Sequence, residues 1–134
     1  MRAIMRRAKE WLGMKKELTV AADVKAEFFL FLDELLVGTL KAVDGSWQFV
    51  YSEEFKHATH LRPLVEFPDL DKVYQNEELW QFFVSRIPST LQPDVETVMV
   101  SESIKDDDIV ALLRRFGKRT IANPFELRQK EAIV

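Results

Sequence analysis

Two histidines are the only imidazole side chains in the chain, and they form the pattern His57-x-x-His60. On one turn of helix, this spacing would offer two nitrogen ligands to a metal ion. No third ligand stands out, and zinc sites need three or four, so we expect no metal site. The acidic run at residues 106–108 is better explained by a helix N-terminus, where negative charge is stabilised, than by a cation site.

The patterns that identify common enzyme classes are missing from the sequence. The four glycines (Gly13, Gly38, Gly45 and Gly117) are isolated, which excludes a glycine-rich phosphate-binding loop. No serine has flanking glycines, as a nucleophile elbow would require. The absence of cysteine excludes disulfide bonds and thiolate chemistry. We therefore expect a protein that is not an enzyme and needs no cofactor.

The net charge of −3 is unevenly distributed along the chain. Residues 1–16 hold six basic residues and one acidic residue, or +5, which leaves −8 for the remainder. An acidic body is a poor match for phosphate backbones, so no direct binding of nucleic acid is expected. The basic run Arg114–Arg119 could contact phosphates with Phe116 stacking on a base, but cations are also favoured at a helix C-terminus.

The N-terminal segment, residues 1–16, is typical of a basic amphipathic helix. Such a helix could lie on a membrane surface, bind a partner, or pack on the domain. No apolar run reaches ~18 residues and no signal-peptide pattern is present, so we expect a cytoplasmic protein without a membrane span. Residues 1–25 are interpreted as extension and linker, 26–127 as the domain, and 128–134 as a tail.

Three strands are predicted in succession, at residues 26–32, 35–43 and 47–51. The dipeptides Asp33-Glu34 and Asp44-Gly45 are expected to turn the chain between them. The first strand is apolar without alternation, which favours burial on both faces. Gly38 indicates a bulge or a close backbone approach. A fourth strand is predicted at residues 62–67.

Short helices are expected to follow the strands. Ser52 would cap one turn, Asn76 a helix over 76–87, and Pro93 would open a third helix. A last helix is predicted from near Asp106 to Gly117, followed by an extended segment over 118–127. Strands first and helices second predict an α+β fold, an antiparallel meander followed by a cluster of short helices packed on it.

The helix predicted over 76–87 carries more apolar surface than one sheet can cover. Trp80 lies within its broad apolar arc, whereas Phe82 falls outside the arc, beside Arg86. Tryptophan and arginine are frequent anchors of protein interfaces, although Trp80 could equally be a core residue. We therefore predict Trp80, Phe82 and Arg86 as partner-binding residues.

Four pieces of the sequence resemble the N-terminal subdomain of HipA-type serine/threonine kinases. The family shows a V-G-x-L hairpin, a G-x-x-x-F-x-Y strand, a P-L strand and an F-F-x-x-L-x-P helix. These motifs fall here at Val37–Leu40, Gly45–Tyr51, Pro63-Leu64 and Phe82–Pro88. The turn Asp33-Glu34, where the family often has glycine, and the segment after Gly117 depart from the pattern.

The resemblance covers roughly residues 26–127, and the ending LLRRFGKRTIANPFEL is similar to HipS, the small antitoxin of three-component HipBST systems. It implies a non-catalytic antitoxin that neutralises a separate HipT-like serine/threonine kinase, in a ternary complex with a HipB-like helix-turn-helix DNA-binding protein. It also implies that a tryptophan, matched here to Trp80, reaches the active-site region of the kinase. The alternatives are a structural assembly module and a peripheral membrane protein that uses residues 1–16.

Overall fold

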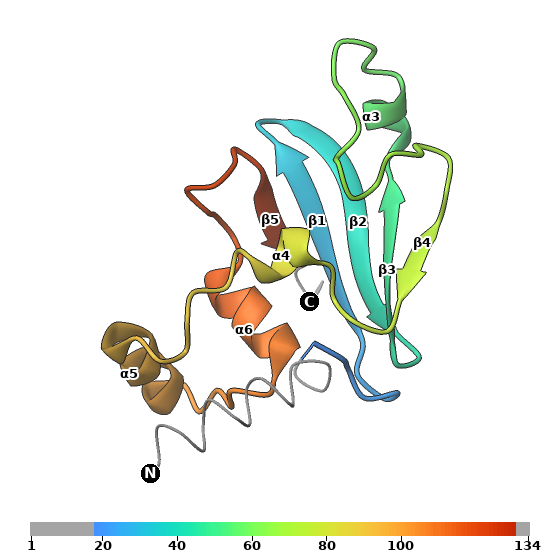
Figure 1. The fold of residues 1–134 in the computed structure, drawn as a ribbon. Coiled ribbons are helices and arrows are strands. Elements are labelled where there is room, and N and C mark those ends of the chain that lie inside the picture. Colours follow the sequence, from blue (N-terminus) through green and yellow to red (C-terminus); the bar gives the residue numbers. More distant parts are fainter. Residues whose placement is uncertain (1–17, 131–134) are drawn as a thin grey trace.

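A computed structural model describes residues 18–130 of the chain (Figure 1). Its strands form one antiparallel sheet in the order β4-β3-β2-β1-β5. They are β1 (Ala26–Leu32), β2 (Leu35–Val43), β3 (Ser46–Tyr51), β4 (Tyr74–Asn76) and β5 (Glu126–Gln129). The helices of the described part are α3 (Glu53–Lys56), α4 (Gln81–Val84), α5 (Pro93–Ser101) and α6 (Ile109–Phe116). The predicted α+β class is confirmed, with α4 and α6 beside one face of the sheet and α5 farther from it.

The two predicted hairpins are present, and their turns use left-handed backbone conformations. Asp33 has a φ of 54° between β1 and β2. Asp44 and Gly45 have φ values of 52° and 78° between β2 and β3. Two successive positive φ values match the twist of antiparallel strands, which explains why Asp-Gly predicts a hairpin well.

Gly38 fulfils both predictions made for it. Leu30 pairs with Gly38 and Phe31 pairs with Leu36, so Val37 is an extra residue in β2 and forms a bulge. A Cβ atom on Gly38 would lie 2.6 Å from the Val50 carbonyl oxygen. Only glycine therefore fits at this close approach of the paired strands β2 and β3 without a shift of the backbone.

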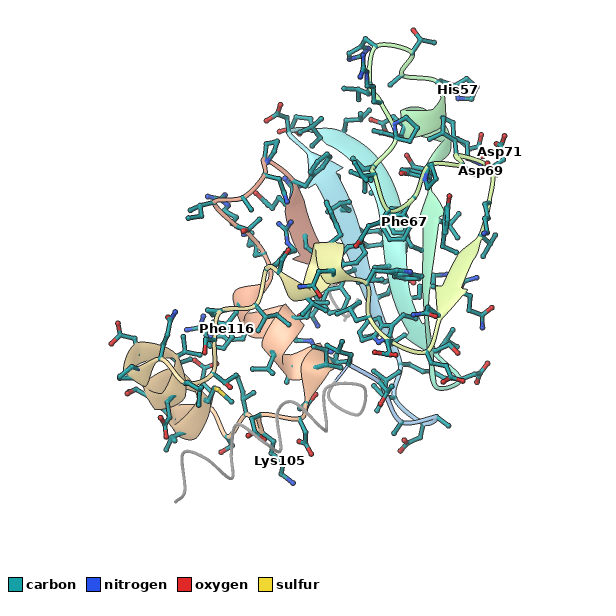
Figure 2. The ribbon with its side chains drawn as sticks, viewed as in Figure 1. His57, Phe67, Asp69, Asp71, Lys105 and Phe116 are labelled. Carbon is teal, nitrogen blue, oxygen red and sulfur yellow. The ribbon has the colours of Figure 1, made fainter. Side chains whose placement is uncertain are left out.

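The core lies between the sheet and the helices. Trp47, Phe49 and Tyr51 point to this side of β3 as predicted, and each is at most 2% exposed. Phe67, which Figure 2 labels over the sheet, packs its ring 4.5 Å from that of Phe49. Phe83 of α4 joins the same cluster, with its ring centroid 5.8 Å from Phe49. The sheet and α4 thus share one aromatic core.

The prediction that β1 is buried on both faces is wrong. Its alternate residues Phe28 and Leu30 are buried, but Phe29 and Phe31 are only partly covered. The guanidinium of Arg128 lies 4.1 Å from the centroid of the Phe31 ring and shields it. β1 is central in the sheet, between β2 and β5, yet its second face carries no helix of the described residues.

The strand predicted over residues 62–67 is also absent, and β4 takes the place beside β3. The segment is instead held as a loop by the phenol of Tyr51. This hydroxyl accepts a hydrogen bond from Leu64 N at 2.8 Å and donates one to the Phe67 carbonyl oxygen at 2.6 Å. A buried side chain thus satisfies backbone groups that a strand would have paired within the sheet.

The helix predicted over 76–87 is reduced to the single turn α4, so this prediction was wrong at its start. Asn76 ends β4, opposite Trp47, and does not cap a helix. Leu79 N donates to the carbonyl oxygen of Leu18 at 2.9 Å, which holds the chain extended just before α4. Trp80 occupies the N-cap position without a side-chain hydrogen bond.

The other helices begin and end near the predicted residues. The Ser52 hydroxyl accepts a hydrogen bond from Phe55 N at 3.0 Å and caps α3. Pro93 is the first residue of α5. Asp108, rather than Asp106, caps α6 by accepting from Ala111 N at 3.0 Å, and Gly117 ends that helix.

The packed domain extends beyond the boundaries predicted at residues 26 and 127. Leu18, Val20 and Val24 pack against the core, and the Leu18 carbonyl oxygen accepts a hydrogen bond from Trp47 Nε1 at 3.0 Å. At the other end, β5 continues to Gln129, within the predicted tail. The predicted amphipathic helix at residues 1–16 lies outside the described residues. Across residues 18–130, no helix is long and apolar enough to cross a membrane.

Candidate functional site

Trp80 lies where the core meets the surface. Its ring contacts Phe67 edge-on, with centroids 5.1 Å apart and planes at 81°, while Phe67 itself is fully buried. The indole is only partly buried, so part of it remains accessible. Trp80 therefore packs against the core and remains partly accessible, and its role as an interface residue stays a prediction.

Phe82 lies in a surface pocket. Its ring packs edge-on against Phe83, at 5.1 Å between centroids, and against Phe125 from the segment before β5, at 5.8 Å. The loop before Phe67 forms the opposite wall, where Val65 is 96% exposed. We call this cavity of about 490 Å³ the α4 pocket; it is lined by Arg62, Pro63, Leu64, Val65, Glu66, Gln81, Phe82, Ser85 and Phe125.

A carboxylate holds the two walls of the α4 pocket together. Glu66 Oε2 accepts a hydrogen bond from Phe82 N at 3.0 Å. This amide is one of the free donors in the first turn of α4, and the Trp80 side chain does not cap them. Glu66 thereby replaces the helix cap that sequence analysis assigned to Asn76, and it fixes the loop against α4.

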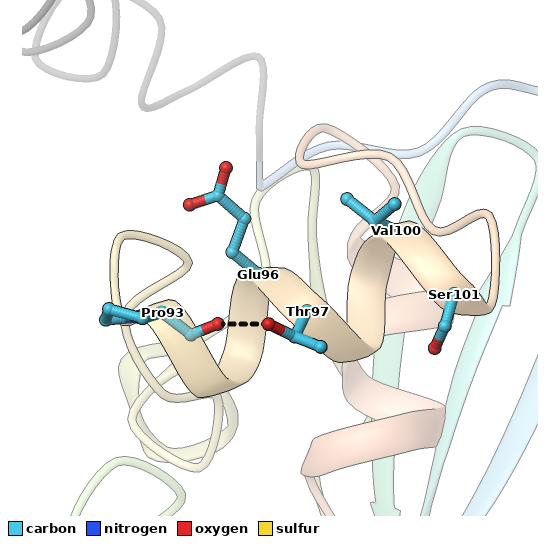
Figure 3. A pocket seen from close by; sticks show the side chains of 5 residues that line it. All are labelled: Pro93, Glu96, Thr97, Val100 and Ser101. Carbon is cyan, nitrogen blue, oxygen red and sulfur yellow. Dashed lines mark hydrogen bonds between the residues drawn. The ribbon is translucent and has the colours of Figure 1, made fainter.

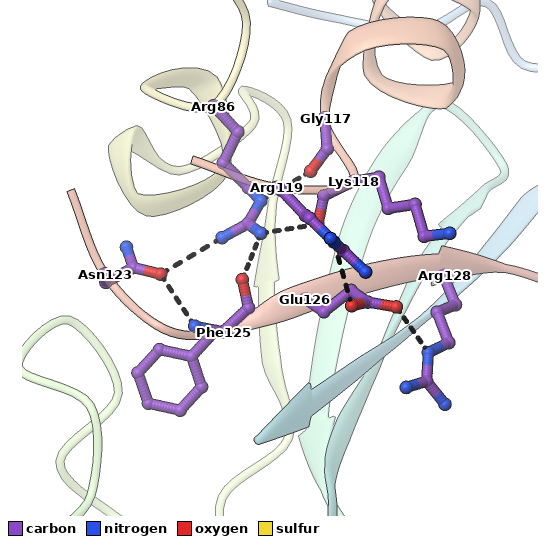
Figure 4. A network of polar contacts seen from close by, with 8 residues as sticks. All are labelled: Arg86, Gly117, Lys118, Arg119, Asn123, Phe125, Glu126 and Arg128. Atoms are coloured by element: carbon purple, nitrogen blue, oxygen red, sulfur yellow. Dashed lines mark hydrogen bonds and ion pairs between the residues drawn. The ribbon is translucent and has the colours of Figure 1, made fainter. Parts of the chain in front are cut away.

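Arg86, the third residue predicted to bind a partner, is buried in this structure. The side chain is 3% exposed, and its guanidinium donates to three carbonyl oxygens and one amide oxygen (Figure 4). The acceptors are Gly117 O at 2.6 Å, Lys118 O at 2.8 Å, Phe125 O and Asn123 Oδ1 at 3.3 Å. Burial lowers the pKa of Arg86 to about 10, and the charge of Glu126 opposes that shift.

The buried position of Arg86 had a signal in the sequence. In the motif F-F-x-x-L-x-P, the fifth residue is apolar, and Arg86 occupies this place between Phe82 and Pro88. A leucine at this position indicates burial, which the helical wheel over 76–87 missed because the helix is only one turn long. The acceptors of Arg86 are three backbone carbonyl groups and the Asn123 side chain, all 31 to 39 residues away, so no local pattern could reveal them.

His57 and His60 have no third potential metal ligand beside them among residues 18–130. His57 is exposed at the end of the molecule that carries α3, as Figure 2 shows, and its Nδ1 lies 2.6 Å from the Glu53 carbonyl oxygen. Among residues 18–130, no three histidine, aspartate or glutamate side chains are arranged to hold a metal ion.

Two of the four basic residues in the run Arg114–Arg119, at the C-terminal end of α6, form ion pairs with acidic residues. Arg115 Nε lies 2.9 Å from Glu102 Oε2, and Arg119 Nε lies 3.2 Å from Glu126 Oε2. Glu126 also accepts from Arg128 at 2.7 Å, and this hydrogen bond is the main cause of the lowered pKa of Glu126. These ion pairs reduce the positive charge that the run can present to a phosphate backbone.

A second cavity, of about 510 Å³, lies along the outer side of α5. Its lining residues, shown in Figure 3, are Pro93, Glu96, Thr97, Val100 and Ser101. The Thr97 hydroxyl donates to the Pro93 carbonyl oxygen at 2.9 Å, and Val100 is 75% exposed. All five residues come from one helix, and they include neither a nucleophile–base pair nor a metal-ligand set.

The α4 pocket is bordered by aromatic rings, and its lining holds no reactive constellation of side chains. The model of the HipA N-terminal domain family matches residues 30–122, more than half of the sequence. The chain belongs to the HipA N-terminal domain family. This is the family of a non-catalytic subdomain, and it associates the chain with toxin–antitoxin systems. No curated protein matches the sequence.

Proposed function

We propose that this protein is a non-catalytic antitoxin that binds and neutralises a separate HipA- or HipT-like serine/threonine kinase. The observation that carries the proposal is the family match over residues 30–122. The similarity of the C-terminal segment to HipS supports the antitoxin role over a purely structural one. The partly exposed aromatic residues Trp80 and Phe82 supply a surface suited to a protein partner.

The kinase would be bound through Trp80 and the α4 pocket. Rings that are anchored on one side and open on the other bury apolar area with little loss of side-chain entropy. A single aromatic anchor of this kind can contribute ~2 kcal/mol or more to binding. An aromatic ring inserted near the nucleotide site would prevent the kinase lobes from closing, which phosphoryl transfer requires.

A HipB-like DNA-binding protein would complete a ternary complex. The antitoxin would then reach DNA only through this partner, because Arg115 and Arg119 are paired with Glu102 and Glu126. Purified alone, the protein should show neither salt-sensitive binding to duplex DNA nor turnover of ATP. Tight binding of the isolated protein to duplex DNA would contradict this part of the proposal.

The test uses a HipA- or HipT-like kinase, which the proposal expects to be encoded beside this protein. Autophosphorylation of the kinase is followed at rising antitoxin concentrations, and the Kd is measured by calorimetry on the same samples. Phe82→Ala should weaken both binding and inhibition, whereas Val100→Ala, on the exposed outer side of α5, should change neither. Binding without inhibition would favour the assembly-module alternative, and a complete lack of binding would refute the proposal.

A further inference from the structure

We propose that Arg86 is a positioning residue that shapes the α4 pocket through the segment 117–125 without touching the partner. This inference deepens the proposed function and rests on it, because it concerns the same binding surface. Arg86 lies behind the pocket, 3% exposed, and is not among the residues that line it. It can therefore affect a partner only through the residues it holds.

The guanidinium connects the two ends of one loop. Gly117 and Lys118, just after α6, accept from Nε and Nη2 at 2.6 and 2.8 Å. Asn123 and Phe125, just before β5, accept from Nη1 and Nη2. Asn123 Oδ1 also accepts from Phe125 N at 3.1 Å, so the end of the loop is tied to the same centre (Figure 4).

Phe125 transmits this arrangement to the binding surface. Its carbonyl group faces Arg86, while its ring packs edge-on against Phe82 and lines the α4 pocket. If the loop shifted, the ring of Phe125 would move away from Phe82 and open one wall of the pocket. The pocket therefore depends on a side chain that contributes no surface to it.

Arginine suits this role because of its shape. Its planar fork carries five N–H donors in a fixed geometry and can serve several carbonyl oxygens at once. Lysine would keep the positive charge, but its three donors share one nitrogen and cannot span acceptors on both ends of the loop. Methionine would leave the carbonyl groups of Gly117, Lys118 and Phe125 without this donor.

The experiment compares Arg86→Lys and Arg86→Met with Phe125→Ala, and with a double variant that combines Arg86→Lys and Phe125→Ala. Amide hydrogen exchange is measured on each isolated protein, and the Kd for the neighbouring kinase is measured by calorimetry. Arg86→Lys removes the planar guanidinium but keeps the positive charge, whereas Arg86→Met removes both. The two variants therefore separate the effect of the fork from the effect of the charge on folding. Met99→Ala, in the separate cluster between α5 and α6, is the matched control for a general loss of stability.

We expect faster exchange over residues 118–125 in Arg86→Lys, with β2 and β3 still protected. Its affinity for the kinase should fall about tenfold, the size expected for one misplaced aromatic contact. Phe125→Ala should cause a similar loss, and the double variant should bind no more weakly than Phe125→Ala alone, because Arg86 acts through Phe125. Met99→Ala should lower the melting temperature without changing the Kd.

Unchanged exchange over residues 118–125 together with an unchanged Kd would overturn the inference. Additive losses in the double variant would also overturn it, because Arg86 would then act by another route. If the wild-type protein itself does not bind the kinase, the proposed function is wrong. The exchange data would then still decide whether Arg86 fixes the loop, so the two failures remain distinguishable.

Discussion

Tyr51→Phe removes the hydroxyl group that holds the loop over residues 62–67. In the wild-type protein this hydroxyl accepts from Leu64 N at 2.8 Å and donates to Phe67 O at 2.6 Å, and the residue is 2% exposed. Phenylalanine keeps the ring, which stacks 5.1 Å from Phe55. The substitution therefore isolates the two hydrogen bonds from the packing.

The expected loss of stability can be worked out from these contacts. Leaving one buried backbone group unsatisfied costs roughly 1–3 kcal/mol, so we expect Tyr51→Phe to lose at least ~1 kcal/mol near pH 8. Burial raises the pKa of Tyr51 from 10.0 to about 12. A difference of two pKa units corresponds to about 2.7 kcal/mol of stability that depends on the protonated phenol.

The sign of the pH dependence follows from proton binding. The unfolded chain loses the phenol proton near pH 10 and the folded protein near pH 12, so the folded protein binds more protons between these values. The contribution of Tyr51 to the free energy of unfolding is therefore complete below pH 10 and falls as the pH rises to 12. Tyr51→Phe lacks this decline.

The assay is urea denaturation of both proteins at pH 8, 10, 11 and 12. Arg86 titrates in the opposite sense, because its lowered pKa makes the folded protein release a proton before the unfolded chain does. It is present in both proteins and cancels in their difference. The wild-type advantage should shrink above pH 10; an advantage that stays constant up to pH 12 would refute the reasoning.

Two further substitutions and a pair of truncations test other parts of the structure. Trp80→Ala should lose ~1–3 kcal/mol of stability, less than the same substitution of a fully buried aromatic residue, and should weaken kinase binding. A variant with a normal melting temperature and normal inhibition of the kinase would show that Trp80 is not an interface residue. Gly38→Ala should lower the free energy of unfolding by ~1–3 kcal/mol, because the alanine Cβ would meet the Val50 carbonyl group. An unchanged melting temperature would contradict this close approach of β2 and β3. Deletion of residues 1–20 removes Leu18, which packs on the core and accepts from Trp47, and should lower the melting temperature. Deletion of residues 1–16 retains Leu18 and is the control for this effect. Equal melting curves for the two truncations would contradict the contribution of Leu18 to stability.

The parts of the fold that the sequence predicted correctly depend on neighbouring residues. Asp44-Gly45 selects a turn because both residues tolerate positive φ, and Trp47, Phe49 and Tyr51 alternate on one strand. Capping residues such as Ser52 act within one helical turn of their partners. These signals are local, so they can be read without knowing the tertiary structure.

The incorrect predictions concern contacts between distant residues. The wheel over 76–87 assumed a long helix, but the hydrogen bond between Leu79 N and Leu18 O holds the chain extended before α4. β4 has three residues, too few for a periodic pattern. The four acceptors of Arg86 lie far along the chain, so no local pattern indicates its hydrogen bonds. The pocket itself combines a loop, a helix and Phe125, and no sequence pattern unites these segments.

The pairing of β5 with β1 affects how the chain is made. β1 is synthesised early, but its free edge is covered only when residues 126–129 have been added. At ~5–20 residues per second, the edge of the phenylalanine-rich segment AEFFLFL stays unpaired for roughly 5–20 s during translation. An unpaired apolar strand edge can pair with another chain, so this interval is the period of greatest risk of aggregation. Pauses in translation between β1 and β5 would lengthen it, and the yield of soluble protein should fall accordingly.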